Sequence, residues 1–178
     1  MSVYLRGLMS SDSEVIYSFK VMEENNLLTI GNIYFTSLDY VKKWVEDTIF
    51  SDTRICLAIC DSETNEMIGF LNINDIDFRN RRAQWGGLLI GNKKDWGKGL
   101  GTEASELMLK FVFEELNINC FWAFWLAENI PSIKLGKKIG FKEIGILKES
   151  IYKGGKYHDQ LIMSIHKNEY DQRKSKLK

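Results

Sequence analysis

The chain of 178 residues has little of what marks several classes of protein. Its three cysteines, Cys56, Cys60 and Cys120, show no CxxC spacing, and its two histidines, His158 and His166, are not spaced as metal ligands are. The sequence therefore predicts neither a disulfide framework nor a metal site. Cys56 and Cys60 lie four residues apart in an apolar strand pattern, which predicts two buried free thiols on one face of that strand.

Long apolar runs and an excess of charge of one sign are also lacking. No run approaches the roughly 18 apolar residues of a membrane span, and the N-terminus lacks the basic start and small-residue cleavage site of a signal peptide. The 24 Lys and Arg residues balance 24 Asp and Glu residues, so no net field attracts nucleic acid or an anionic membrane. We therefore expect a cytoplasmic protein with no nucleic-acid and no membrane partner.

Linkers are absent too, because the chain has a single proline, Pro131, and no repeat or low-complexity stretch. A hydrophobic fraction of 44% at this length is enough to bury one core. We expect one domain over residues 1–170, followed by a basic, solvated tail over residues 171–178.

The apolar periodicity predicts an alternation of helices and strands. Helices are expected within residues 11–23, 36–50, 100–116 and 129–140, and strands within 3–8, 54–61, 66–76, 82–91, 120–127, 143–152 and 156–165. The helix from residue 100 connects two strands by a right-handed crossover, so strands 82–91 and 120–127 should be parallel in an otherwise antiparallel sheet. The predicted fold class is mixed α/β (α+β). That helix should bury one stripe, which consists of Ala104, Leu107, Met108, Phe111, Val112 and Leu116.

Three glycines, Gly97, Gly99 and Gly101, lie between the strand and the helix. A glycine-rich loop that leads into a helix presents unpaired N–H groups and the positive end of the helix dipole, which together favour a phosphate. A Walker A loop does not fit, because Lys98 is followed by Gly99 rather than by Ser or Thr. A dinucleotide fingerprint through Gly99, Gly101 and Ala104 fits poorly, because no acidic residue follows about 20 residues later.

The loop from Trp96 to Gly101, "WGKGLG", resembles the pyrophosphate loop Q/R-x-x-G-x-G/A of the GNAT acetyltransferase superfamily. The longer stretch "WGKGLGTEA" is similar to the form found in the RimJ/RimL-like branch. The resemblance continues in family order over residues 54–170, through "ENIPSIKLGKKIGFKEIGIL" and "ESIYKGGKYHDQLIMSI", and spermidine acetyltransferases also resemble "YFTSLDYVKKWVEDTI".

The resemblance implies a GNAT fold, with a central parallel strand pair that splays apart to admit acetyl-CoA. Backbone groups of the strand would pair with pantetheine, the loop would hold the pyrophosphate, and residues at the start of the next helix would contact the cofactor beyond the splay. The implied acetyl-CoA-binding residues are Leu88, Leu89, Ile90, Trp96, Gly97, Lys98, Gly99, Leu100, Gly101, Thr102, Asn129 and Ser132.

The implied reaction is attack of a neutral amine on the thioester, with a backbone N–H near Leu89 or Ile90 stabilising the oxyanion. Gln84 stands where relatives often have a glutamate base, and Gly136 stands where they often have a tyrosine that protonates the CoA sulfur. Catalytic roles therefore have to be sought elsewhere. The candidates are Asn129, Glu23 and Tyr157, followed by Glu24, Asp75, Asp77, Glu128, Tyr152 and His158.

Without a strong base, the enzyme should prefer an amine with a pKa below the value of about 10.4 typical of lysine. We expect an acetyl-CoA-dependent N-acetyltransferase acting on a peptide N-terminus or an amino sugar. A polyamine acetyltransferase and a non-catalytic acyl-CoA-binding protein are the alternatives. By resemblance, Glu23, Glu24, Tyr34 and Phe35 would contact the acceptor, and the protein could form a homodimer.

Overall fold

A computed structural model describes residues 2–27, 29–30 and 36–176 of the chain. Tyr34 and Phe35, two of the expected acceptor contacts, lie outside the described residues. The elements in chain order are β1 (Val3–Gly7), η1 (Ser10–Asp12), α1 (Ser13–Lys20), α2 (Glu23–Leu27), α3 (Leu38–Ile49), β2 (Ile55–Asp61), β3 (Met67–Asp77), β4 (Arg82–Ile90), η2 (Lys93–Asp95), α4 (Leu100–Lys110), η3 (Phe111–Glu115), β5 (Cys120–Leu126), α5 (Ile130–Lys138), β6 (Lys142–Lys153), β7 (Lys156–His166) and α6 (Lys167–Lys176).

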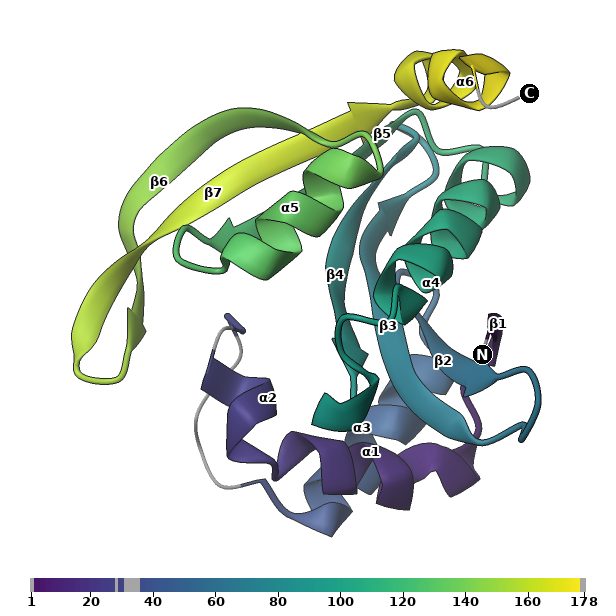
Figure 1. Ribbon diagram of the computed structural model, residues 1–178, viewed down its shortest axis with the longest axis vertical. Helices are drawn as coiled ribbons and strands as arrows, with labels where there is room; N and C mark the ends of the chain where they lie inside the picture. The colour runs from purple at the N-terminus through teal and green to yellow at the C-terminus, as the bar shows by residue number, and fades with distance from the viewer. Residues whose placement is uncertain (1, 28, 31–35, 177–178) are drawn as a thin grey trace.

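The strands form one seven-stranded sheet in the order β1-β2-β3-β4-β5-β7-β6. Strands β4 and β5 are parallel, and the other pairs of neighbours are antiparallel. The predicted mixed α/β fold with a central parallel pair is therefore confirmed. Figure 1 shows the long β6–β7 hairpin reaching away from the rest of the sheet, beside α2 and α5.

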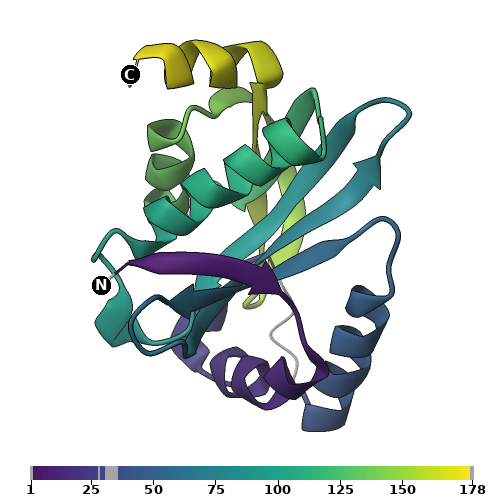
Figure 2. The same ribbon diagram turned by 90° about the vertical axis from the view of Figure 1, so that its right-hand side faces the viewer.

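Helices cover both faces of the sheet (Figure 2). Helix α4 packs on one face, over a large core that includes Leu71, Met108 and Phe121. Helices α1 and α3 pack on the other face, over a smaller cluster formed by Ile16, Phe19, Val41, Val45, Cys56 and Phe70. Cys56 and Cys60 are buried free thiols, as the sequence predicts. Within the described ranges, no helix combines the length and the apolar character needed to cross a membrane.

The first predicted helix, within residues 11–23, is shorter than expected, and a second short helix that the sequence did not predict follows it. Helix α1 ends at Lys20, because the side-chain amide of Asn25 donates to the carbonyl of Phe19 at 2.8 Å and that of Asn26 donates to the carbonyl of Lys20 at 2.7 Å. These bonds satisfy carbonyls that would otherwise be unpaired at a helix end. The short helix α2 then follows, and Lys20 is left at the end of α1, beside the space between α2 and the sheet.

The buried face of α4 and its continuation η3 is rotated relative to the predicted stripe. Ala104, Met108 and Val112 are buried as expected, but Leu107 is 37% exposed and Leu109 and Phe113 are buried. The reason is α6, which begins at Lys167 and continues into residues 171–176 of the predicted solvated tail. Tyr170 of α6 stacks on Phe113 with ring centroids 4.9 Å apart and so gives this side of the α4–η3 helix a partner.

Candidate active site

The central strand pair separates halfway along its length. Residues 82–85 of β4 pair with residues 120–123 of β5, and the remainder of β4, up to Ile90, pairs with β3 alone. A bulge marks the point of separation, because Ile73 of β3 lies opposite Trp85 and Asn72 lies opposite Gly87. Gly87 has a φ of 127°, a conformation that favours glycine. The backbone of β4 beyond Trp85 is thus left without a strand partner on the β5 side.

A cavity of about 750 Å³ opens at this gap. It extends from α1, α2 and α3 on one side to the start of α5 on the other. Its lining consists of Lys20, Asn25, Asn26, Thr29, Ile30, Thr36, Ser37, Tyr40, Phe70, Asn72, Trp85, Gly86, Gly87, Leu88, Leu89, Phe124, Trp125, Leu126, Asn129 and Ser132. Four of the expected acetyl-CoA-binding residues, Leu88, Leu89, Asn129 and Ser132, are therefore brought together here. A cavity of this size is typical of a small-molecule site.

The glycine loop forms a backbone cradle at the N-terminus of α4. Gly97 and Gly99 have φ of 75° and 86°, and a Cβ at either position would meet no other atom within 4 Å. The first intrahelical bond shown there runs from the N–H of Glu103 to the carbonyl of Gly99, so the N–H groups of residues 100–102 precede it. Open space over donor groups at the positive end of an 11-residue helix fits the diphosphate of CoA.

Trp96 and Lys98 have definite partners in this loop. The indole N–H of Trp96 donates to the carbonyl of Ile90 at 2.8 Å and ties the loop to the end of β4, so that carbonyl is already occupied by the protein. The Lys98 ammonium lies 2.8 Å from the buried carboxylate of Asp95. Both side chains therefore hold the shape of the cradle, in which Leu100, Gly101 and Thr102 begin the helix.

We predict that Gly99→Ala weakens acetyl-CoA binding by about tenfold and lowers stability by about 1 kcal/mol, because alanine is strained at positive φ and its methyl group enters the cradle. Calorimetric titration and urea unfolding measure the two effects. Gly145→Ala is the matched control, because Gly145 has no positive φ and also faces open space. Unchanged affinity in the Gly99 variant would remove the loop from the CoA site.

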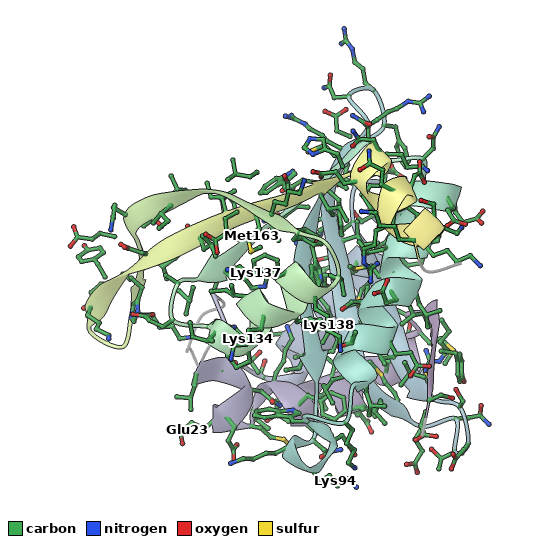
Figure 3. The ribbon with its side chains drawn as sticks, turned by 45° about the horizontal axis from the view of Figure 1, so that its top comes forward. Glu23, Lys94, Lys134, Lys137, Lys138 and Met163 are labelled. Atoms are coloured by element: carbon green, nitrogen blue, oxygen red, sulfur yellow. The ribbon has the colours of Figure 1, made fainter. Side chains whose placement is uncertain are left out.

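Asn129 caps α5, because its side-chain oxygen accepts from the N–H of Ser132 at 3.2 Å. This role fixes the turn between β5 and α5 at the edge of the cavity. Further along the helix, Lys134 and Lys138 are exposed (Figure 3), and Lys137 pairs with Glu143 at 2.7 Å. Lys134 and Lys138 are additional cations on the helix that follows the splayed strand, and the sequence pattern did not single them out.

Gly136 lies in contact distance of an aromatic ring. A Cβ at position 136 would be 2.9 Å from Cη2 of Trp125, so the indole occupies the space into which a larger residue would project. The ring is held by Trp85 and Phe141, whose centroids are 5.6 and 5.7 Å from it. The structure thus accounts for the missing tyrosine in steric terms. Gln84 lies in the paired part of β4, opposite Trp122, and is not among the residues that line the cavity.

The acidic candidates for a general base do not meet in the cavity. Glu23 and Glu24 are exposed on α2, and Glu23 lies at its outer side (Figure 3). Asp75 is exposed on β3. Asp77 accepts from Asn80, which together with Arg82 keeps the pKa of its carboxyl below the usual value. None of these side chains is part of the described cavity lining.

Glu128 and His158 pair with each other. His158 Nδ1 lies 2.8 Å from the Glu128 carboxylate, and its Nε2 lies 3.0 Å from the carbonyl of Lys153. Both partners are acceptors, so only the imidazolium can donate to both. The tyrosine candidates Tyr152 and Tyr157 are 66% and 65% exposed and contact each other near the end of the hairpin, outside the described cavity lining.

The hairpin instead contacts the side of the cavity next to α2 through Lys153. This side chain is buried, and its ammonium donates to the carbonyls of Asn26 and Thr29. Burial lowers the pKa of its amine. Lys153 therefore joins β6 to the segment after α2, a connection over more than 120 residues of chain that no local pattern indicates.

Three comparisons place this geometry in a family. The acetyltransferase (GNAT) domain model matches residues 2–142, which is most of the chain. The protein therefore belongs to the GNAT acetyltransferase domain family, as the sequence resemblance indicates.

Two relatives of the chain are described as N-acetyltransferases. An uncharacterized N-acetyltransferase, p20, of Bacillus licheniformis is 36% identical over 113 residues, which cover 64% of this chain and 62% of that protein. The spermidine N(1)-acetyltransferase of Escherichia coli is 29% identical over 111 residues, or 62% of this chain and 57% of that protein. The chain thus spans less than two thirds of the length of both relatives.

Among solved structures, the spermidine N-acetyltransferase of Vibrio cholerae in complex with CoA and spermine has a TM-score of 0.87. It is 23% identical, and the superposition covers 94% of this chain and 97% of that one. At this identity the likeness establishes the fold alone. The acceptor has to be inferred from the residues of this chain.

Proposed function

We propose that the protein is an acetyl-CoA-dependent N-acetyltransferase that acts on a primary amine, with a peptide N-terminus or an amino sugar as the favoured acceptor. The gap between β4 and β5, where the cavity opens, and the glycine cradle, whose Gly101 lies beside Leu88 of that gap, support the cofactor half of this proposal. In the reaction, the amine nitrogen forms a bond to the acetyl carbon, the C–S bond breaks, and CoA leaves as the thiol.

The acceptor half is supported by the charge of the cavity. Its described lining contains no aspartate or glutamate, and the sequence from Asn25 to Ser37 contains none either. A polyamine carries several ammonium groups, and binding them in a partly desolvated cavity without carboxylates would be unfavourable. The observation favours an acceptor with a single amine over spermidine.

The chemistry agrees with this preference. The cavity lining described by the structure offers no carboxylate or histidine as general base. An α-amine has a pKa of about 8, against about 10.4 for a lysine amine, so about a tenth of it is neutral at pH 7 rather than less than one in a thousand. An amine of low pKa therefore needs little help to become a nucleophile.

The test is release of free thiol from acetyl-CoA with spermidine, an alanine-led peptide and glucosamine as acceptors. We expect kcat/KM for the peptide or the amino sugar to exceed that for spermidine by at least tenfold. Preference for spermidine would favour the polyamine alternative, for which the V. cholerae fold likeness is the supporting observation. Binding of acetyl-CoA with no thiol release from any acceptor would favour the non-catalytic alternative.

The RimJ/RimL-like assignment and a homodimer belong to this proposal as well. Strand β6 is one of the two edges of the sheet, and it exposes Ile144, Ile146 and Leu147 by 62, 52 and 44%. An exposed apolar edge strand is a surface that a second copy could cover.

A further inference from the structure

The cavity contains one ionisable charge among its described lining residues, the ammonium of Lys20. This side chain is half-buried, and its Nζ lies 4.2 Å from the ring centroid of Trp44 on α3. No carboxylate of the described residues lies within ion-pair distance of it. A cation removed from water is costly unless it is paired with negative charge.

The neighbours of Lys20 do not provide that charge. The Trp44 ring offers its negative face, but no oxygen that could accept a hydrogen bond. Cys56 is the nearby thiol, and burial raises its pKa to about 12, so it is neutral at pH 7. Burial also lowers the pKa of the Lys20 amine, which is the expected response of an ammonium without a counter-charge.

Two more polar groups of the same lining lack partners within the described part of the chain. They are the hydroxyl of Thr36 and the indole N–H of Trp85, both of which are buried. The indole can only donate a hydrogen bond, as the ammonium does, and the hydroxyl can donate as well. Buried polar groups are normally paired, so an ammonium without a counter-charge at a cavity, with an unpaired buried hydroxyl in the same lining, indicates a ligand that brings acceptor oxygens.

From this set we infer, building on the proposed function, that the acceptor is a primary amine carrying an anionic oxygen group, a carboxylate or a phosphate, and that Lys20 binds that group. This assignment makes Lys20 a specificity-determining residue for acetyl transfer. The same arrangement excludes polyamines, because a ligand ammonium would face Lys20 without a carboxylate to offset the repulsion.

The experiment compares two matched pairs of acceptors that differ only in the anionic group: glucosamine 6-phosphate against glucosamine, and an Ala-Asp peptide amide against an Ala-Asn peptide amide. Turnover is measured as thiol release, and binding to the CoA-saturated protein is measured by calorimetry. We expect the native protein to prefer the anionic member of at least one pair by tenfold or more, as a hydrogen bond to a charged group typically provides.

Lys20→Met keeps the length of the side chain but removes its charge, and it should reduce that preference to about one. Lys20→Arg keeps the positive charge and should retain most of the preference for the anionic acceptor. Lys42→Met is the matched control, because Lys42 is exposed on the neighbouring helix α3, lies outside the cavity lining and makes the same change in net charge. The control should keep the full preference.

Thiol release and calorimetric binding together distinguish the proposal of acetyl transfer from the proposal of an anion subsite at Lys20. An anionic preference in binding that depends on Lys20, without turnover of any acceptor, would refute acetyl transfer and keep the anion subsite. Turnover with equal use of both members of each pair, or the same loss in the Lys20 and Lys42 variants, would refute the anion subsite and keep the transferase.

Discussion

Replacing Gly136 by tyrosine, the residue that the family resemblance implies at this position, is expected to destabilise the fold by about 2–3 kcal/mol, the usual cost of overpacking a core. Position 136 is buried, and even a Cβ there would lie 2.9 Å from Trp125. The indole cannot move aside freely, because Trp85 and Phe141 pack against it. Part of the cost will be offset by the loss of a helical glycine, which is worth about 1 kcal/mol.

A double-mutant cycle in urea unfolding measures this coupling. Trp125→Val alone should cost about 3 kcal/mol, because it leaves a cavity beside Trp85. Combined with Gly136→Tyr, the tyrosine ring can fill that space, so the pair should be at least 1.5 kcal/mol more stable than the sum of the single changes indicates. Strict additivity of the two changes would show that Trp125 and Gly136 are not coupled.

Gly136 stands in place of the implied tyrosine, and the ring of Trp125 fills the space beside it. This difference also affects the chemistry that the proposed reaction can use. An indole N–H does not act as an acid at physiological pH, so Trp125 cannot replace a tyrosine as proton donor. A thiol has a pKa of about 8.5, however, and its anion leaves a tetrahedral intermediate without an obligatory acid. If the chain acts as proposed, the missing tyrosine is the less costly of the two departures, and the missing base at Gln84 is the one that would restrict the acceptor.

The parts of the site that could be predicted from the sequence are those set by local backbone chemistry. Gly97 and Gly99 have positive φ, and a glycine loop between a strand and a helix commonly binds phosphate. The glycine cradle could therefore be predicted from residues that are close together in the sequence. The parallel pair of strands followed from a chirality rule that depends only on the order of elements.

The acceptor side could not be predicted in the same way. Lys20 ends helix α1, where a lysine is explained equally well by the helix dipole. Lys20, Thr36 and Trp85 line one cavity only because α1, the segment before α3 and β4 pack together. The coupling of Trp125 to Gly136 likewise joins a strand to the following helix. Contacts of this kind leave no regular spacing in the sequence. The catalytic candidates suggested by the sequence therefore include Glu23 and Tyr157, which are exposed and outside the described cavity lining.

The C-terminal helix α6 is another element that the sequence did not predict. Its composition is strongly polar, and the sequence therefore indicated a solvated tail from residue 171 onward. One residue, Tyr170, determines that the helix docks, because it is 6% exposed, stacks on Phe113 and donates its hydroxyl hydrogen to Glu114 at 2.5 Å. Arg173 adds a two-point contact with Glu106 of α4. A single buried aromatic in a polar segment is too weak a pattern to separate from a loop.

We accordingly expect Tyr170→Ala to lower the free energy of unfolding by about 3–5 kcal/mol, the usual cost of removing a buried aromatic ring. Tyr170→Phe should cost only about 1 kcal/mol, because the stacking on Phe113 remains and Glu114 keeps its ion pair with Lys174. Gln172→Ala, at an exposed position on the same helix, controls for helix propensity. Urea unfolding measures all three variants.

The contrast between these variants decides whether α6 belongs to the folded domain. If α6 is part of it, the Tyr170→Ala variant will also lose protection from proteolysis at Phe113, since the stacked ring is what covers that side of the α4–η3 helix. Equal, small effects of the alanine and phenylalanine changes would mean that the ring contributes little. The core would then end at β7, and the helix after His166 would extend the solvated tail that the sequence predicts for residues 171–178.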